Sequence, residues 1–246
     1  MRCVGGSLDA FKAVLHDADI SVQVSALEAM DTLGSTIPWP DHIQSAGYVR
    51  LLVDLIRDHD SMDVKAAALT TLCRCIDVGS AGAAEAVRSC NALAVLISLW
   101  TPSSGGRVRE ESARAFSLLT FMPEARPAAV ALGVVPPLLK LMQDRAPGVR
   151  TAAASVAMSL VVDDSAKEAF LVGGVVNALS KLAADPARFV RLNTLRALCT
   201  LCASPDARAV ARSLGLVDTV RKLTSVPDRL EADVASKTLA ALEFNP

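Results

Sequence analysis

A short hydrophobic phrase recurs along the chain at nearly constant intervals. Each copy starts with a glycine or, once, an asparagine, continues with two small or apolar residues, and ends in an amphipathic run with paired hydrophobic residues. The six starting positions are Gly6, Gly47, Asn91, Gly133, Gly174 and Gly215, which lie 41, 44, 42, 41 and 41 residues apart. Self-similarity at such a period is typical of repeat architectures. The pattern therefore predicts a solenoid of about six units.

A second apolar phrase opens about sixteen residues after each start. In the first five units its opening residue is a valine: Val22, Val64, Val108, Val149 and Val190. Eight and eleven positions later stand Met30 and Leu33, Leu72 and Cys75, Phe116 and Leu119, Ala157 and Leu160, Leu198 and Leu201, then Leu239 and Leu242. These spacings are close to whole helical turns, so the residues share one buried face. Each unit is thus expected to hold a helix of about ten residues followed by a longer one.

A short third segment precedes most of the glycines, as in residues 42–46, 128–132 and 210–214. It has the length of one or two helical turns, and the following glycine tolerates the positive φ that often ends a helix. Proline and aspartate mark the bends between the longer helices. No stretch resembles a strand-hairpin pattern, so the fold class is predicted to be all-α.

This three-helix unit resembles the armadillo repeat, and the match is closest at residues 133–142, Gly-Val-Val-Pro-Pro-Leu-Leu-Lys-Leu-Met. The consensus of the family at these ten positions is glycine, a small residue, an aliphatic residue, proline, any residue, leucine, an aliphatic residue, any residue, leucine and leucine. A proline fits the first helical turn, where its missing N–H costs nothing. The resemblance covers essentially the whole chain and implies a right-handed α-solenoid of about six armadillo-type repeats. HEAT repeats, which normally have two helices, are the nearest competitor, and the glycine and the short first helix favour the armadillo repeat.

The repeat pattern indicates a single solenoid over residues 1–246, with units at about 6–37, 38–80, 81–122, 123–163, 164–204 and 205–246. Because Gly6 stands so near the start, the first unit is expected to lack its short leading helix. Neither end carries an obvious polar cap, and a terminal repeat without one exposes the face that a neighbour would cover. We therefore expect one or both ends to pack against another chain, or the chain to be a segment of something longer.

Composition and charge narrow the class of partner. Hydrophobic residues make up 52% of the chain and aromatics only 4%, which favours closely packed helices rich in Ala, Val and Leu. Lys and Arg total 25 against 26 Asp and Glu, so the chain has no net attraction to nucleic acid or to an anionic membrane. The apolar stretches are too short to span a bilayer, and the N-terminus lacks a secretory signal. A cytoplasmic protein with reduced cysteines is expected.

The resemblance also implies where a partner would bind. In the armadillo family the third helices line a concave groove, and the groove-facing places lie six and ten residues after each opening residue. Nuclear-import adaptors carry a Trp and Asn ladder there, which holds a basic peptide. Here the places hold Glu28 and Thr32, Thr70 and Arg74, Arg114 and Leu118, Ser155 and Ser159, Arg196 and Thr200, then Lys237 and Ala241. Without that ladder, a nuclear-localisation peptide is not the expected ligand.

A line of basic residues remains at these places. The candidate partner-binding residues are Arg74, Arg114, Asn193, Arg196 and Lys237. Arginine and lysine favour an acidic or phosphorylated segment through charge-assisted hydrogen bonds. The alternative is that they are ordinary solvated charges on helix surfaces.

A second basic series follows the opening valines directly: Lys65, Arg109, Arg150 and Arg191. This place lies on the packed side of the helix. We therefore expect these side chains to bridge to an acidic group of the preceding repeat and not to contact a ligand.

Candidate catalytic and metal-binding motifs are few. Cys199-Thr-Leu-Cys202 has the spacing of a zinc or redox half-site, but no second Cys or His pair follows, and zinc needs four ligands. Core packing is the expected role of these cysteines and of Cys73 and Cys75. The histidines His16, His42 and His59 stand near no nucleophile motif. No catalytic, cofactor or metal site is predicted.

Residues 101–107, Thr-Pro-Ser-Ser-Gly-Gly-Arg, depart from the repeat and are rich in turn formers. They are expected to form a flexible loop at the edge of the stack, where Trp100 could anchor a partner.

The sequence thus predicts a non-enzymatic protein-interaction scaffold or structural component of a multiprotein assembly. Its partners would be other proteins, bound through the groove or packed on the repeat ends, and neither nucleic acid nor membrane. A cytoskeletal or ciliary axonemal assembly is one setting that fits. The alternative function is a peptide-capturing adaptor in nuclear transport or ubiquitin ligation. Fold-level resemblance does not choose between these pathways.

Overall fold

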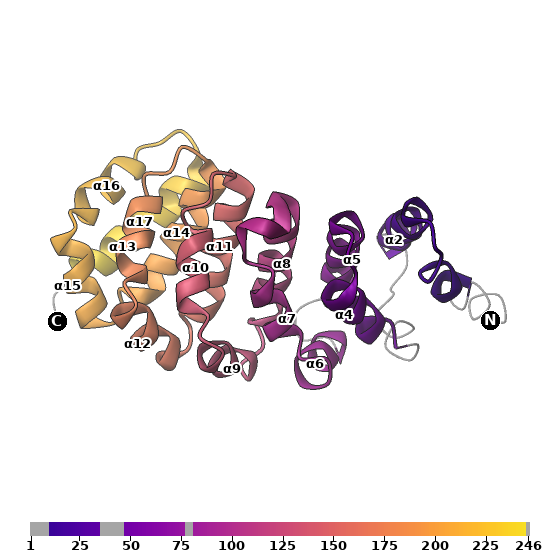
Figure 1. Cartoon of the computed structure of the whole chain (residues 1–246). Helices are drawn as coiled ribbons and strands as arrows, with labels where there is room; N and C mark the ends of the chain where they lie inside the picture. Colours follow the sequence, from indigo (N-terminus) through magenta and orange to yellow (C-terminus); the bar gives the residue numbers. More distant parts are fainter. Residues whose placement is uncertain (1–9, 35–46, 77–80, 245–246) are drawn as a thin grey trace. The chain divides into compact units, whose positions relative to one another are not determined.

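A computed structural model describes residues 10–34, 47–76 and 81–244, which are helices joined by short turns without any strand (Figure 1). The chain divides into two compact units, Met1–Met122 and Pro123–Pro246. Their boundary coincides with the predicted boundary between the third and fourth repeats. Gly6, the missing leading helix of the first repeat, segment 42–46 and His42 all lie outside the described residues. One solenoid over all six repeats stays a prediction.

The first unit contains the predicted helix types in the predicted order. Its long third helices are α2 (Ile20–Gly34), α5 (Met62–Cys75) and α8 (Gly105–Leu119), and α5 packs against both others. The second helices are α4 (Tyr48–Asp58) and α7 (Ala92–Ser98). A short first helix, α6 (Ala81–Arg88), starts where the third repeat was expected to start.

The second unit holds three complete three-helix repeats. Its first helices are α9 (Ala125–Ala131), α12 (Asp164–Val172) and α15 (Pro205–Ser213). The second helices are α10 (Val135–Leu141), α13 (Val175–Leu182) and α16 (Leu216–Leu223). The third helices are α11 (Pro147–Leu160), α14 (Arg188–Leu201) and α17 (Arg229–Glu243), and α14 packs between α11 and α17. The predicted three helices per repeat and the longer third helix are therefore confirmed, with 14 or 15 residues in each third helix. The second helices have only 7 or 8 residues and are no longer than the first helices, so their predicted length of about ten residues is wrong in this unit.

The residue that starts each repeated phrase from Gly47 onward adopts the left-handed backbone conformation. Gly47, Gly133 and Gly215 each have φ 71° and Gly174 has φ 76°, and the following residue begins or nears the second helix. Asn91, which replaces glycine in the third repeat, has φ 53° and is the one non-glycine residue with positive φ in the described parts of the chain. Asparagine reaches this region more easily than other residues with a Cβ, which explains the exchange.

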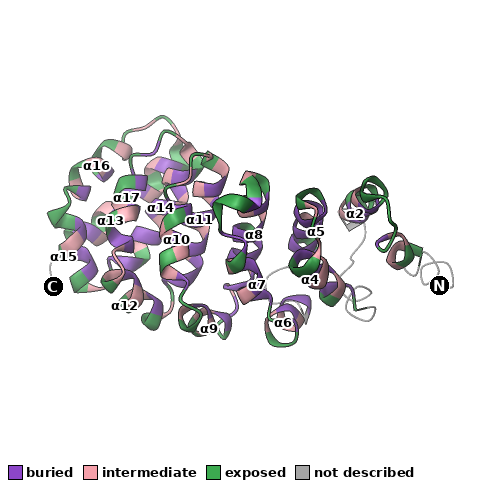
Figure 2. Ribbon diagram, viewed as in Figure 1, coloured by how far each residue is buried: buried purple, intermediate pink, exposed green. Residues whose placement is uncertain are grey.

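The core follows the predicted helical register (Figure 2). The opening valines of the four repeats from Val64 to Val190 are buried, as are the residues eight and eleven places later. In the outer repeats the register weakens, because Leu33 of α2 is 39% exposed and Leu239 of α17 is half-buried. Among the described helices, α2 and α17 each pack against one third helix instead of two. Val22, the opening valine of α2, is also 37% exposed, so the expected burial of Val22 and of these two leucines is wrong.

The expected loop at residues 101–107 is a second departure. Pro102–Ser104 form a short 3-10 helix, and α8 begins at Gly105. Proline and serine are common where helices start as well as in loops, so composition did not separate the two. Trp100 is 2% exposed and its ring packs edge-on against Phe116, with centroids 4.9 Å apart. It is a core residue and cannot anchor a partner.

Candidate functional site

Each third helix carries one set of places that share a direction. The set includes the residue one place before the opening residue and the residues three, six and ten places after it. The last three lie four, seven and eleven residues beyond the first, and these spacings are close to whole helical turns. We call this set the third-helix face. In the second unit it consists of Gly148, Ala152, Ser155 and Ser159 on α11, Phe189, Asn193, Arg196 and Thr200 on α14, and Leu230, Val234, Lys237 and Ala241 on α17.

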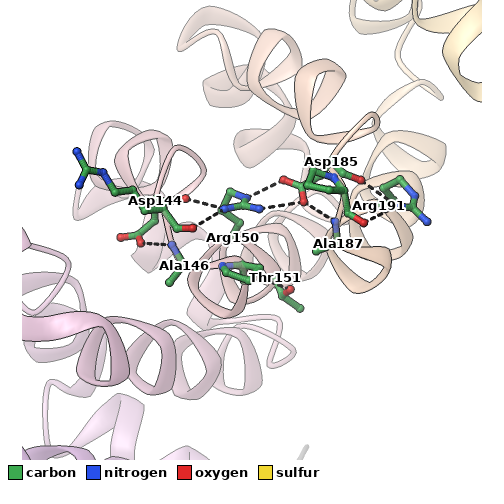
Figure 3. Close-up of polar contacts among 10 residues, drawn as sticks. Asp144, Ala146, Arg150, Thr151, Asp185, Ala187 and Arg191 are labelled. Atoms are coloured by element: carbon green, nitrogen blue, oxygen red, sulfur yellow. Dashed lines mark hydrogen bonds and ion pairs between the residues drawn. The ribbon is translucent and has the colours of Figure 1, made fainter.

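Two half-buried arginines, Arg150 and Arg191, tie the turns before the third helices of the second unit to the next repeat (Figure 3). Arg150 donates to Asp185 through Nε at 2.7 Å and Nη2 at 3.0 Å, and its Nη1 donates to the carbonyls of Asp144 and Arg145. Arg191 repeats the arrangement with Glu231, at 2.5 and 3.0 Å, and with the carbonyls of Asp185 and Pro186. We call each arrangement an arginine clip. Each clip ties the turn before the arginine's own helix to the next repeat. Arg150 reaches the turn before α14 through Asp185, and Arg191 reaches the first turn of α17 through Glu231.

The clips correct one prediction. Asp185 and Glu231 belong to the repeat that follows the arginine, and not to the preceding repeat. The other two members of the basic series bond to backbone carbonyls of their own repeat, Lys65 to Arg57 at 3.2 Å and Arg109 to Pro102 at 3.3 Å. The predicted structural role of the series is therefore right, but the direction of its ion pairs is wrong.

The charge of Asp185 depends on its clip. Burial alone would raise the pKa of this carboxyl group, but the hydrogen bonds from Arg150 and the Ala187 N–H and the charges of Arg150 and Arg191 lower it below its ordinary value. The hydrogen bond to Asp185 in turn raises the pKa of Arg150. Both groups are therefore ionised at neutral pH.

The two predicted cations of the first unit are paired. Arg74 on α5 donates to Asp31 on α2 at 2.7 Å, and Arg114 donates to Glu111 on α8 at 3.3 Å. Burial raises the pKa of Glu111, whereas the charge of Arg114 lowers it. The third-helix side of this unit therefore mixes acidic and basic groups.

The predicted residues of the second unit have a different environment. Arg196 is half-buried and Lys237 is exposed, and neither side chain forms an ion pair within the described residues. They occupy equivalent places on neighbouring helices. The Nδ2 of Asn193 donates to the carbonyl of Thr151 on α11 at 3.4 Å, which is a long hydrogen bond. The third-helix face of this unit contains no Asp or Glu.

Two exposed apolar residues lie on the same face and were not predicted. Phe189 is 60% exposed and Leu230 is 47% exposed, at the same place in successive repeats. Arg188 lies over the ring of Phe189, 5.0 Å from its centroid, and is held by Asp228 at 2.6 Å. The groove-facing places implied by the armadillo resemblance lie six and ten residues after the opening residue and do not include the place of Phe189 and Leu230. Phe189 and Leu230 each stand directly before the opening residue and lie 41 residues apart, and this repetition is the sequence signal that could have identified them.

The candidate chemical residues occupy structural environments. Cys73, Cys75 and Cys202 are buried, and burial raises their pKa to about 12, about 12 and about 11. Cys199 is only half-buried, which departs from the expected core position. The Nδ1 of His59 accepts the Ser61 N–H at 3.0 Å before α5. No group of three or more His, Cys, Asp or Glu side chains that could hold a metal occurs in the described ranges.

A hollow of about 580 Å³ lies on the first-helix side of the second unit, between α12 and α15. Asp164, Glu168 and Asp206 line it together with Val172, which is 84% exposed. Lys167 also lines it and pairs with Asp164 at 2.8 Å. This surface is separate from the third-helix face.

Comparison with solved structures places the fold. The chain is similar to an engineered protein of known crystal structure, with a TM-score of 0.87, 24% identity and 96% of each chain covered. It is also similar to a computationally designed armadillo repeat protein for modular peptide recognition, with a TM-score of 0.84, 20% identity and coverage of 97% of this chain and 100% of the other. A designed armadillo repeat protein in complex with the peptide (KR)4 has a TM-score of 0.84, 19% identity and coverage of 96% and 99%. The chain therefore has an armadillo-like repeat fold, as predicted.

No protein-family model matches the sequence, and a search among curated proteins finds no match. None of the helices in the described parts of the chain is long and apolar enough to cross a membrane.

Proposed function

We propose that this chain is a non-enzymatic protein-binding scaffold that holds an anionic segment of another protein against the third-helix face of its second unit. The observation that carries the proposal is the pair Arg196 and Lys237. They stand in register on neighbouring helices, without an ion pair among the described residues and without a carboxylate on the same face. Cations in that setting form charge-assisted hydrogen bonds with carboxylate or phosphate groups.

The similar folds support peptide binding but suggest a different charge. One designed armadillo repeat protein is in complex with (KR)4, a peptide of lysine and arginine. On this chain, such a peptide would meet like charges at Arg196 and Lys237, which disfavours it. An acidic or phosphorylated segment avoids that repulsion. The mixed charges around Arg74 and Arg114 give the first unit no comparable preference.

The test compares short labelled peptides for binding to the whole chain by fluorescence anisotropy. One peptide is rich in glutamate, the second carries phosphoserine, and the third is (KR)4. We expect the two anionic peptides to bind, more weakly as salt is added, and (KR)4 not to bind. The Arg196→Glu/Lys237→Glu variant should lose both anionic peptides.

A matched control reverses two other exposed cations of the same repeats. Lys181 on α13 and Lys222 on α16 also stand 41 residues apart, but on second helices. The Lys181→Glu/Lys222→Glu variant has the same net charge as the test variant and should keep both peptides. Equal loss in the two variants would mean that net charge, and not the third-helix face, governs binding, and the proposal would then be wrong.

We also infer that the outer face of α2 contacts another protein. Val22 is 37% and Leu33 39% exposed, whereas the equivalent Val64 and Cys75 are buried. A Leu33→Ser variant should release a partner bound there while it keeps the anionic peptides. A cytoplasmic cytoskeletal or ciliary setting, and the alternative of an adaptor in nuclear transport or ubiquitin ligation, stay predictions that identification of the captured partner would test.

A further inference from the structure

On the third-helix face of the second unit, the places one before and three and six after the opening residue form three parallel rows of side chains. An apolar row consists of Phe189 and Leu230, and a cationic row consists of Arg196 and Lys237. Each row joins equivalent places on α14 and α17, which pack together. Between them lies a middle row that includes Asn193. A ligand on this face therefore meets apolar groups along one edge and positive charge along the other.

From these rows we propose that the segment bound on this face is extended and has acidic and apolar side chains in alternation. This inference rests on the function proposed above and specifies the ligand of the same site. Successive side chains of an extended chain point to opposite sides. A segment lying along the middle row would thus direct every second side chain to the apolar row and the others to the cationic row.

The dimensions fit this arrangement. Seven residues separate Phe189 from Arg196, which is about 10 Å along a helix axis. In an extended ligand, side chains that point to opposite sides of the backbone span about 10 Å from tip to tip, which matches this separation. Packed helices lie about 8 to 10 Å apart, so a segment that crosses from α14 to α17 advances by about two to three residues. An advance of two residues brings side chains of the same side to equivalent places on the two helices. The long arms of Arg196 and Lys237 can follow acidic side chains that are about two to four residues apart.

The middle row supplies a contact for the backbone of such a segment. The Asn193 amide carries two donor hydrogens and one acceptor oxygen. Its only described hydrogen bond is the 3.4 Å contact to the Thr151 carbonyl. The amide can therefore pair with a peptide group of an extended ligand, whose N–H and C=O groups have no internal partner. A helical ligand has no such groups to offer along its length.

The apolar row is fixed before a ligand binds. Arg188 lies over the Phe189 ring and is itself tied to Asp228, so the ring is held at the surface. Because Phe189 and Leu230 are already largely exposed, covering them with an apolar side chain of the ligand removes apolar surface from water. The two residues then add to affinity without any rearrangement of the core.

The test uses peptides with the same numbers of glutamate and leucine in different orders. One peptide alternates glutamate and leucine, a second separates them into two blocks, and a third places the leucines on one face of a helix. All three have the same charge. We expect the alternating peptide to bind the whole chain about tenfold more tightly than either isomer, since two apolar contacts are gained.

Two variants separate this inference from the proposed function. Phe189→Ser/Leu230→Ser should lower the affinity for the alternating peptide to that for the blocked isomer and leave the purely acidic peptide unaffected. Arg196→Glu/Lys237→Glu should lose every anionic peptide. The matched control is Val172→Ser/Leu214→Ser, which removes two other exposed apolar residues of the same repeats, near the ends of the first helices, and should change nothing.

Equal affinities for the three isomers, or tightest binding of the helical one, would overturn the alternating ligand. If the Arg196→Glu/Lys237→Glu variant still lost the peptides, the proposed function would stand. Failure of all anionic peptides to bind the parent chain would overturn both. Circular dichroism of each variant checks that it remains folded, which the exposure of the changed side chains leads us to expect.

Discussion

Replacing Arg150 by methionine should destabilise the second unit far more than removal of an exposed ion pair. Methionine keeps much of the apolar stem but removes the guanidinium. The variant loses two hydrogen bonds to the Asp185 carboxylate and two to backbone carbonyls. It also leaves Asp185, whose side chain is 6% exposed, with a buried charge and only the Ala187 N–H as a close donor.

The cost follows from that burial. Breaking a buried ion pair by removing one partner costs about 3 to 5 kcal/mol, because the remaining charge is uncompensated. The Arg150 side chain is 13% exposed and Asp185 lies in a turn, so we expect about 3 kcal/mol. Arg74→Met removes a pair whose side chains are 49% and 24% exposed, and should cost about 1 kcal/mol or less.

Urea unfolding of both variants, followed by far-UV circular dichroism, measures the difference. The two units can unfold in separate transitions, so the transition assigned to the second unit is the one compared. A double-mutant cycle with Asp185→Asn isolates the interaction between the two side chains. A loss no larger in Arg150→Met than in Arg74→Met would show that the clips do not couple neighbouring repeats.

The pH dependence gives a second check. The folded-state pKa of Asp185 lies below its ordinary value, so its contribution to stability is complete above that ordinary value of about 4 and is lost as pH falls through the folded-state pKa. In Arg150→Met the hydrogen bonds and charge of Arg150, which lower this pKa, are absent, and burial raises it. The stability difference between parent and variant should therefore shrink as the pH falls from the higher pKa of Asp185 in the folded variant to its lower pKa in the folded parent.

Three further predictions follow from the fold. Gly174→Ala should cost about 1 to 2 kcal/mol in urea unfolding, because φ 76° is unfavourable for a residue with a Cβ. Thr238→Val should cost about 1 kcal/mol in the same assay, because it removes the buried hydrogen bond from Thr238 to the Leu195 carbonyl; no loss would mean that this contact is not formed. In the native protein, a thiol reagent with peptide mapping should label Cys199 and spare Cys73, whose pKa burial raises to about 12; labelling of Cys73 before unfolding would contradict its position.

The repeat and its register could be predicted because they are local. The left-handed glycines and the core places on third helices depend on helical periodicity and on one backbone conformation per repeat. The same periodicity placed Arg150 and Arg191 on a packed side. It could not say which neighbouring repeat supplies the acid, because the direction of stacking is not contained in one helix.

The candidate site was predicted only in part. Arg196 and Lys237 were found from their places in the repeat, whereas the pairing of Arg74 with Asp31 depends on a contact between helices from different repeats. Phe189 and Leu230 were missed because a single apolar residue next to the buried opening residue of a third helix is expected to belong to the core. Only the exposure of both residues in the folded chain separates them from it.

The arginine clips make the fifth repeat, residues 164–204, complementary to itself. It carries Asp185, which accepts the hydrogen bonds from Arg150 of the preceding repeat. It also carries Arg191, which donates the equivalent hydrogen bonds to Glu231 of the following repeat. Asp144 and Arg150 show the same spacing in the fourth repeat. If the fifth repeat were duplicated in tandem, Arg191 of the first copy would meet Asp185 of the second in the arrangement that Arg150 and Asp185 already have. The chain thus contains a module that could lengthen the stack without a new interface having to be designed.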